Sequence, residues 1–400
     1  MRKVVVMPDG NWLSHVSRPL EIAKALRELG GYQIVFAGDG AYMRLPRECG
    51  FDVRPALTHA PDHVMRCSRS GRANWWDYAT LAAHVEADLE VFTQEKPDLV
   101  LGDFRLSLST SCELAEIPLA VTLNAAWTDY YSARVRAPEH LWVTRALGRR
   151  LTTRLFPLVK SAILRLDSRP FRRYRRERGL APRHNIWDVW RGNLNLIVDT
   201  PEYGPTEELP DSFQYIGPIV WEPDIALPPW LDRLDPDRPT VYFTMGSTGY
   251  PHFFELAVEL FGDSEYQGVM TTAGMARFDK LPDNFFAADY APGSALMERS
   301  DVVVCHGGNG TIYQALGHGV PIIGIPTMHD QEFNLDRVVA LGAGIHLSEL
   351  RFRPEHLEQA VQEVLANGSY RAGARRQQAG LGQFNGPRAG ARAIDSFMSA

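Results

Sequence analysis

The residues best suited to chemistry form a glycine-rich run, HGGNGT at residues 306–311, which follows a strand-like run at residues 301–305. Glycine lets the backbone approach a bound group closely, and the free N–H groups at a helix start favour an anion. His306 adds a side-chain donor for a phosphate oxygen. The run therefore predicts a phosphate-binding turn. The alternative is a tight turn that needs glycine only for its positive φ.

A second run, GSTG at residues 246–249, repeats this arrangement after the apolar residues 240–245. The hydroxyls of Ser247 and Thr248 are suited to the same phosphates. Two such turns in one α/β segment favour the phosphate interpretation over two unrelated turns. Neither run matches the dinucleotide fingerprint G-x-G-x-x-G or the P-loop G-x-x-x-x-G-K-[ST], which excludes nicotinamide-dependent dehydrogenases and P-loop NTPases.

A candidate proton acceptor lies in the first half of the chain. His15 follows the apolar run at residues 4–7 and is expected in a loop that faces a ligand. Histidine titrates near neutral pH, so it is suited to accept a proton from a hydroxyl. Asp103 ends another apolar run, and the carboxyl ends of parallel strands meet at one sheet edge. The alternative for His15 is a capping or solvated residue, and Asp9 is expected to be a turn residue.

The elements that must position these residues alternate between strands and helices. The strands expected in the first half are residues 4–7, 34–37, 98–102, 118–123, 193–199 and 213–217, with helices at 20–29 and 107–116. This alternation predicts a doubly wound parallel sheet. The pattern restarts at residue 240, which predicts a second α/β domain. Ligands are expected in the cleft between the two domains, at the carboxyl ends of the strands.

The boundary between the two domains is marked by prolines. Residues 218–239 contain six prolines, which suits a stiff linker. We therefore divide the chain into a first domain at residues 1–217, a linker at 218–239, a second domain at 240–385 and a C-terminal helix at 386–400. The linker sequence Asp235-Pro236-Asp237 resembles a D-x-D metal motif, but its proline makes it a turn, and we predict no metal site.

Composition excludes several classes of protein. The chain has 400 residues and a formal net charge of −6, so it lacks the surplus positive charge of a generic nucleic-acid binder. Its four cysteines include no C-x-x-C pair, which predicts free thiols in a reducing cytoplasm. The apolar run at residues 4–7 is too short for a signal peptide, and no run of about 20 apolar residues occurs. A cytoplasmic globular protein is therefore expected.

One segment departs from this acidic average. Residues 134–183 contain 15 basic and three acidic residues, in a stretch that looks helical but is broken by prolines. The simpler interpretation is a set of helices paired with the acidic remainder of the chain. The alternative is a peripheral contact with an anionic membrane or an amphiphilic acceptor, because apolar residues lie among the arginines.

The stretch from Tyr290 to Gln331 resembles the donor-binding signature of the inverting, two-domain nucleotide-sugar glycosyltransferases. This family includes plant natural-product glucosyltransferases and bacterial macrolide and aglycone glycosyltransferases. Its signature opens on a Trp, continues through H-x-G-x-x-[ST], a Glu-Ala pair and G-V-P, and closes on [DE]-Q. Here Tyr290 stands at the opening, residues 306–311 form the core and Asp330-Gln331 closes it without a gap. Two positions depart from the signature: Gly293 replaces a Gln, and Gln314 replaces the Glu that usually clamps the ribose.

The resemblance implies a GT-B-like fold of two facing Rossmann-like domains, with the last helix crossing back to the first domain. It gives the acceptor to the first domain and the nucleotide sugar to the second. Tyr290 would stack on the base, Gln314 would meet the ribose, and Asp330 and Gln331 would bind the sugar hydroxyls. The residues expected at the diphosphate are Ser247, Thr248, His306, Gly308, Asn309, Gly310 and Thr311. The family role of a base falls on His15, which Asp103 would orient.

The sequence therefore predicts a metal-independent, inverting glycosyltransferase that needs no cofactor. Its partners would be a UDP- or dTDP-sugar and a small hydrophobic acceptor, in a monomer or homodimer. The aromatic residues expected at the acceptor are Trp12, Phe104, Trp127 and Tyr130. The alternatives are a lipid glycosyltransferase at a membrane surface, a nucleotide-sugar epimerase and a non-catalytic nucleotide-sugar-binding protein.

Overall fold

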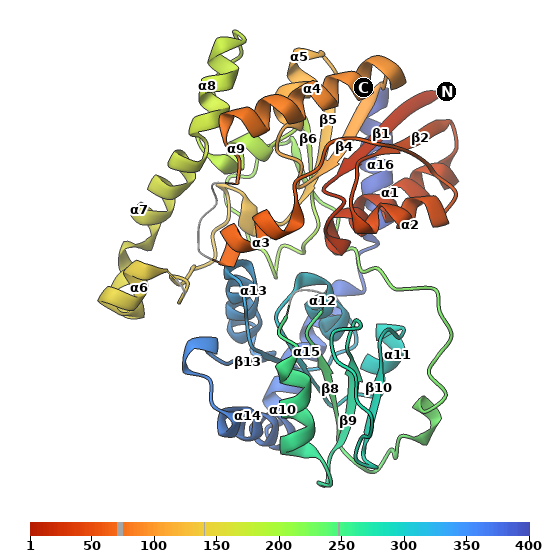
Figure 1. Ribbon diagram of the computed structural model, residues 1–400, viewed down its shortest axis with the longest axis vertical. Coiled ribbons are helices and arrows are strands. Elements are labelled where there is room, and N and C mark those ends of the chain that lie inside the picture. The colour runs from red at the N-terminus through yellow and green to blue at the C-terminus, as the bar shows by residue number, and fades with distance from the viewer. Residues whose placement is uncertain (70–74, 140, 247–248) are drawn as a thin grey trace. The chain divides into compact units, whose positions relative to one another are not determined.

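The structure is a computed structural model that describes residues 1–69, 75–139, 141–246 and 249–400 (Figure 1). The chain folds into two compact units. The first unit comprises Met1–Arg134, Arg154–Trp221 and Phe384–Ala400, and the second comprises Val135–Thr153 and Glu222–Gln383. Each unit contains one parallel β-sheet with helices around it, so the predicted class of two α/β domains is confirmed.

The first unit is built on a seven-stranded parallel sheet of order β3-β2-β1-β4-β5-β6-β7. Its strands are β1 (Arg2–Pro8), β2 (Tyr32–Ala37), β3 (Asp52–Arg54), β4 (Leu99–Asp103), β5 (Leu119–Leu123), β6 (Leu194–Ile197) and β7 (Phe213–Tyr215). The central strands are buried along nearly their whole length. This burial is why they read as continuous apolar runs rather than as alternating patterns.

Helices cover both faces of this sheet. They are α1 (Leu13–Leu29), α2 (Arg44–Glu48), α3 (Pro61–Arg69), α4 (Tyr78–Glu95), α5 (Leu108–Leu114), α7 (Arg149–Asp167), α8 (Arg169–Glu177), α9 (Ile186–Trp190) and α16 (Gly386–Ser399), with short 3₁₀ turns at Ala41–Met43 and Ala125–Trp127. The C-terminal helix α16 packs against α1, and both contribute to one hydrophobic core. Helices α4, α5, α8 and α9 contribute to a second core on the other face.

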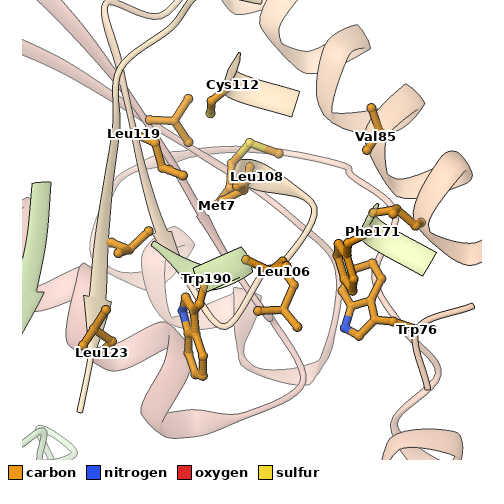
Figure 2. Close-up of a cluster of buried hydrophobic side chains, with 14 of the residues drawn as sticks. Met7, Trp76, Val85, Leu106, Leu108, Cys112, Leu119, Leu123, Phe171 and Trp190 are labelled. Carbon is orange, nitrogen blue, oxygen red and sulfur yellow. The ribbon is translucent and has the colours of Figure 1, made fainter. Parts of the chain in front are cut away.

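Figure 2 shows this second core. Trp76 and Phe171 meet with their ring centroids 5.5 Å apart, and Trp190 lies near Leu106. Side chains from α4, α5, α8 and α9 therefore close over the sheet together. Trp76, although it belongs to an aromatic-rich segment, is a core residue with 4% of its surface exposed.

The second unit contains a six-stranded parallel sheet of order β10-β9-β8-β11-β12-β13. Its strands are β8 (Thr240–Thr244), β9 (Gln267–Thr271), β10 (Phe285–Ala288), β11 (Val302–Cys305), β12 (Ile322–Gly324) and β13 (Gly344–His346). Its helices are α6 (Trp142–Leu147), α10 (His252–Phe261), α11 (Gly293–Met297), α12 (Asn309–Gly317), α13 (His329–Ala340), α14 (Pro354–Ala366) and α15 (Gly368–Leu381), with 3₁₀ turns at Leu231–Arg233 and Glu349–Arg351. A core of aliphatic and phenylalanine side chains joins α10 and α14 to the sheet.

Each sheet has a point at which the strand order reverses direction. In the first sheet, β1 and β4 are neighbours, and Pro8 at the end of β1 is paired with Asp103 at the end of β4. In the second sheet, β8 and β11 are neighbours, and Thr244 is paired with Cys305. The loops after such strand pairs diverge and leave room for a ligand. His15 follows β1, Asp103 ends β4, Gly246 follows β8 and His306 follows β11.

The segment 135–153 belongs to the second unit, although it lies within the residues 1–217 assigned above to the first domain. Its attachment is polar. The backbone N–H of Glu139 donates to both carboxylate oxygens of Glu332 on α13, at 3.1 and 2.9 Å. Arg149 pairs with Glu139 at 3.0 Å and with Asp336 of α13 at 3.4 Å. Local sequence patterns do not encode such long-range ion pairs, so the segment could not be assigned from the sequence.

Among the helices of the described residues, none is both long and apolar enough to cross a bilayer.

Candidate active site

In the first unit, His15 is held by an aspartate at the end of the neighbouring strand. Nδ1 of His15 lies 2.6 Å from Oδ1 of Asp103, whose side chain is fully buried. The same Nδ1 lies 2.8 Å from the guanidinium Nη2 of Arg18, which can only donate. A proton on Nδ1 suits the carboxylate, which only accepts, and that tautomer leaves the lone pair on Nε2. The ring of His15 also stacks on Phe104, with centroids 4.4 Å apart and an interplanar angle of 5°. The imidazole is therefore fixed in orientation by Asp103, Arg18 and Phe104.

The position of His15 differs from the expected loop. Helix α1 already begins at Leu13, and Pro19 lies inside it rather than at its first turn. A proline is common at the first position of a helix, which favoured a later start in the sequence. Because His15 is in the first turn of a long helix, its backbone is more rigidly placed than a loop would allow.

Two further side chains hold the Asp103 carboxylate. The guanidinium of Arg18 donates to Oδ1 at 2.9 Å, and the hydroxyl of Thr122 on β5 donates to Oδ2. Arg18 also donates to Oδ1 of Asn124 at 2.9 Å. We call His15, Arg18, Asp103 and Thr122 the histidine–aspartate site. It combines an imidazole with a buried ion pair between Arg18 and Asp103.

Sequence analysis missed most of this support. Asn124 donates to Asp199 at 2.8 Å, and the same carboxylate accepts the backbone N–H of Ala125. Arg18 was open to detection, because residues three apart on a helix share a face, so His15 and Arg18 point the same way. The contribution of Thr122 follows from the register of β4 with β5, which pairs Asp103 with Thr122. That register is not readable from the sequence.

Asp9 forms the turn after β1. Its Oδ1 accepts the backbone N–H of Asn11 at 3.1 Å, the arrangement of an Asx turn. Burial raises the pKa of Asp9 above its usual range, and the nearby His15 opposes this rise in part.

The four aromatic residues predicted at the acceptor are partly exposed and lie in the first unit. Phe104 has a positive φ of 56° and packs edge-on to Trp190 as well as flat on His15. Trp127 packs against Trp187, and Tyr130 against Phe213. Trp12 precedes the first residue of α1. Of these, Phe104 contacts the ring of His15 directly, whereas Trp127 and Tyr130 have aromatic partners of their own.

In the second unit, a ring and two glycines pack together. His306 follows β11, and a Cβ on Gly246 would lie 2.5 Å from its Cε1, while a Cβ on Gly308 would lie 2.7 Å from its Nε2. Gly246 and Gly307 have φ values of 54° and 90°, which favour glycine. We call Gly246 together with residues 306–310 the glycine turn. Its glycines are needed for positive φ and for the close approach of the His306 ring, whereas the phosphate interpretation stays a prediction.

The glycine turn has polar atoms without partners. Helix α12 begins at Asn309 without a side-chain cap. Among the described residues, neither Nδ1 of His306 nor Oδ1 of Asn309 has a hydrogen-bond partner. Burial lowers the pKa of His306 to about 4, so the ring is neutral at pH 7. The start of α12 thus offers N–H groups and a positive dipole end to an anion. Gly310 has open space around its Cα, and Thr311 is partly exposed.

The other predicted donor-binding residues lie on α13, where Asp330 and Gln331 are found, and before α11, where Tyr290 is found. Oε1 of Gln331 accepts hydrogen bonds from the backbone N–H groups of Thr327 and Met328, at 2.7 and 3.2 Å, so the side chain caps α13. Asp330, the preceding residue, is partly exposed. Tyr290 has 58% of its surface exposed, which leaves its ring accessible for stacking. Ser247 and Thr248 lie outside the described residues.

Comparisons with known proteins assign the fold to a family. The chain superposes on the calicheamicin glycosyltransferase CalG4 with a TM-score of 0.73 and 19% identity, over 100% of this chain and 98% of that one. It superposes on the glycosyltransferase VinC, solved in complex with dTDP, with a TM-score of 0.72 and 19% identity, over 99% of each chain. Residues 263–382 match the family described as Erythromycin biosynthesis protein CIII-like, C-terminal domain.

Two curated relatives are closer in sequence. The chain is 35% identical over 379 residues to the PGL/p-HBAD biosynthesis glycosyltransferase of Mycobacterium tuberculosis (strain ATCC 25177 / H37Ra), over 94% of this chain and 87% of that protein. It is 36% identical over 379 residues to the PGL/p-HBAD biosynthesis rhamnosyltransferase of Mycobacterium bovis (strain BCG / Pasteur 1173P2), over 94% and 83%. The chain belongs to the GT-B glycosyltransferase family. The predicted resemblance and the predicted enzyme class are confirmed.

In this glycosyltransferase, the two departures from the family signature pack against each other. The amide of Gln314 fills the space that a Cβ on Gly293 would need, so a side chain at position 293 is excluded while Gln314 keeps this rotamer. Nε2 of Gln314 donates to Oε1 of Glu222 at 2.7 Å, and the backbone N–H of Ser294 donates to the same oxygen. Glu222, from the predicted linker, was missed by the sequence analysis. It places a carboxylate next to the position where the signature has Glu.

Within the described part of the chain, no group of three or more His, Cys, Asp or Glu side chains is arranged to hold an ion.

Proposed function

We propose that this glycosyltransferase moves a sugar from a UDP- or dTDP-sugar to a hydroxyl of a small hydrophobic acceptor, with inversion and without a metal ion. The observation that carries the proposal is the contact between Nδ1 of His15 and the buried Asp103 carboxylate. This contact leaves Nε2 as the basic atom of a ring whose orientation is fixed. The proposal requires the donor and the acceptor to meet at this atom.

The chemical step is a single displacement. Nε2 of His15 takes the proton from the acceptor hydroxyl while that oxygen attacks the anomeric carbon. The bond between the anomeric carbon and the phosphate oxygen breaks, and the diphosphate leaves with the electron pair. Attack in line with the leaving group inverts the anomeric centre. Asp103 stabilises the imidazolium that forms, and Arg18 and Thr122 hold Asp103 in place.

The leaving diphosphate is assigned to the glycine turn. Backbone N–H groups at the start of α12 and the dipole of that helix stabilise the negative charge that develops, which is the role a cation fills elsewhere. Neutral His306 contributes one N–H donor. Asn309 contributes its side chain, and Gly308, Gly310 and Thr311 border the same helix start.

The base, the sugar and the ribose of the donor are assigned to side chains of the second unit. The exposed ring of Tyr290 stacks on the base, and Asp330 binds a sugar hydroxyl. The side-chain oxygen of Gln331 caps the start of α13, so the proposed contact of this residue with the sugar uses its amide nitrogen. At the ribose, the Gln314 amide and the Glu222 carboxylate form one hydrogen-bonding unit. The VinC complex with dTDP supports testing thymidine donors beside uridine donors.

The first experiment is a pair of histidine variants. In His15→Ala, we expect sugar transfer to fall by about 10²–10⁴-fold while the thermal shift with UDP or dTDP is unchanged. His63→Ala is the matched control, because His63 is an exposed histidine of the same unit. Transfer by His15→Ala at a near-normal rate would overturn the base assignment. A chelator should change neither binding nor transfer, and dependence on added metal would contradict the metal-independent mechanism.

A further inference from the structure

The outer face of α7 carries an apolar stripe in the first unit. Leu155, Leu158 and Leu166 have 41%, 75% and 58% of their surfaces exposed. With Ala162 between them, their spacing of three and four residues places them on one side of the helix. Exposed leucines are normal when scattered, but a row on one face marks a surface that meets an apolar phase or a partner.

Arginines accompany this stripe. Arg154 and Arg165 flank it on α7, and Arg169 and Arg176 are exposed on α8, which follows directly. Residues 154–176 contain eight basic residues and one acidic residue. Among the described residues, no carboxylate lies within ion-pair distance of these four arginines. The simpler interpretation of the basic segment, pairing with the acidic remainder of the chain, therefore does not hold for this face.

The basic face is also hollowed. An open depression of about 470 Å³ lies at α8, and its lining consists of Tyr78, Arg169, Pro170, Arg172, Arg173 and Arg176. Arg173 is paired with Glu177 at 3.0 Å, and Arg172 donates to backbone carbonyls. Arg169 and Arg176 remain as cations without a protein counter-ion at this depression. A single phosphate group is of a size to enter it.

This face is rigidly attached to the rest of the unit. The inner side of α8 contributes Phe171, Tyr174 and Arg175 to the interior, and α8 packs against α4. Figure 1 draws α7 and α8 on the outer side of α4 and α9. The arginines of α8 are therefore presented to the outside by buried anchors on the same helix, and α7 buries Phe156.

We propose that α7 and α8 form a docking surface for a membrane that contains anionic lipids. The leucines enter the boundary between headgroups and acyl chains, and the arginines bind headgroup phosphates. Apolar and cationic side chains on one helix face are typical of helices that lie in a membrane surface. A nucleic acid would use the arginines but not the leucine row. The net charge of −6 for the whole chain makes this positive face a local feature rather than an average property.

The test is co-sedimentation with vesicles, which needs no sugar donor and so is independent of the proposed function. Wild-type protein is mixed with phosphatidylcholine vesicles, with and without phosphatidylglycerol, at low and at high salt. We expect binding to the anionic vesicles at low salt and a decrease at high salt. Absence of binding to anionic vesicles at low salt would overturn the proposal.

Two double variants locate the surface. Arg169→Ser with Arg176→Ser should lower the partition coefficient for anionic vesicles by about twentyfold. Leu158→Ser with Leu166→Ser should lower it by about tenfold and remove most of the binding that survives high salt. The matched controls are Arg388→Ser with Arg392→Ser, exposed on α16, and Leu29→Ser with Leu57→Ser, two exposed leucines of the same unit. Melting temperatures verify that all four proteins fold.

Three results would contradict the proposal. The first is equal loss of binding in the control variants, which would indicate a general charge effect. The second is unchanged binding in both α7–α8 variants. The third is self-association of the wild type that the leucine variant abolishes, since the stripe would then be an interface between two copies of this chain.

Discussion

The histidine–aspartate site is held together by charged side chains, whereas the glycine turn is held together by backbone geometry. Around His15, every support is a side chain: the Asp103 carboxylate, the Arg18 guanidinium and the Thr122 hydroxyl. Around His306, the neighbours are glycines whose missing Cβ atoms make room for the ring. The first arrangement is suited to accept and stabilise a proton, and the second is suited to expose N–H groups to an anion.

The two histidines differ accordingly. His15 has the Asp103 carboxylate beside it, and 18% of its side chain is exposed. His306 is buried without a counter-ion, and its pKa of about 4 keeps it neutral. We propose that the same residue type serves as a base in one unit and as a neutral donor in the other. The environment decides which role each plays.

The largest effect that tests this contrast is expected from Asp103→Asn. An amide at position 103 leaves Arg18 without its counter-ion and does not enforce the protonated Nδ1 of His15, so we expect turnover to fall by about 10³-fold or more. Loss of the buried ion pair should also cost about 3 kcal/mol of unfolding free energy. Turnover is measured at a temperature where the variant is folded, with UDP or dTDP binding as the check.

The control for this variant is Asp98→Asn, just before the other end of the same strand. Asp98 is exposed and accepts a hydrogen bond from the backbone N–H of Lys3. It should keep normal turnover. Similar losses in both variants would mean that Asp103 acts only on the stability of the sheet.

A smaller effect is expected when a methyl group is added to the glycine turn. Gly310→Ala has open space in the protein, so it should stabilise α12 by about 0.5–1 kcal/mol. If the diphosphate lies against this helix start, the added methyl should weaken nucleotide binding by about tenfold or more. Gly317→Ala, at the last residue of the same helix and equally open, should stabilise the protein without affecting binding. Isothermal titration with UDP and dTDP checks both, and equal affinities would place the diphosphate elsewhere.

The next pair separates a binding role from a structural one on α13. Gln331→Ala should lower the unfolding free energy by about 1–2 kcal/mol, because Thr327 and Met328 lose their hydrogen-bond acceptor. Asp330→Ala should leave stability almost unchanged and reduce discrimination between donor sugars. Chemical denaturation and competition between sugar donors measure the two effects. A stability loss confined to Asp330→Ala would reverse the assignment.

The smallest effect concerns a carboxylate outside both sites. Burial raises the pKa of Asp167 to about 6, and Oδ2 has no hydrogen-bond partner among the described residues. The folded protein therefore binds a proton more tightly than the unfolded chain. The contribution of Asp167 to the free energy of unfolding is fully present below about pH 4 and is lost as the pH rises towards 6 and beyond. Asp167→Asn should add about 1 kcal/mol at pH 7 and almost nothing at pH 4, measured by urea unfolding. Equal gains at both pH values would exclude a titration effect.

The sequence was sufficient to predict helices, strands and the α/β class, because buried parallel strands appear as apolar runs such as residues 4–7. It was weaker for short strands such as β3, β10 and β13, of three or four residues each. Their burial depends on neighbours far along the chain, which a local pattern does not contain. The start of α1 was misplaced for a different reason, because Pro19 favours a helix start where the structure has a helix interior.

The site residues divide in the same way. His15, Asp103 and His306 follow strands, so the rule that strand ends gather at one sheet edge was enough to select them. Arg18, Thr122 and Glu222 support other residues, and their contributions depend on sheet register or on contacts across many residues. The packing of Gly293 against Gln314 also required the structure, because in the sequence they are two unrelated departures from a signature.

The placement of residues 135–153 determines how this protein can be dissected. The polypeptide passes between the two units four times. Residues 135–153 cross into the second unit before the chain returns to the first, and the C-terminal tail from residue 384 goes back to the first unit again. A cut in the linker therefore does not release two modules. The C-terminal fragment would contain Glu332 without its partners Glu139 and Arg149, together with an α16 separated from α1. An independently folding second unit needs residues 135–153 joined to 222–383, so the route to it is an internal deletion of 154–221 rather than a simple truncation.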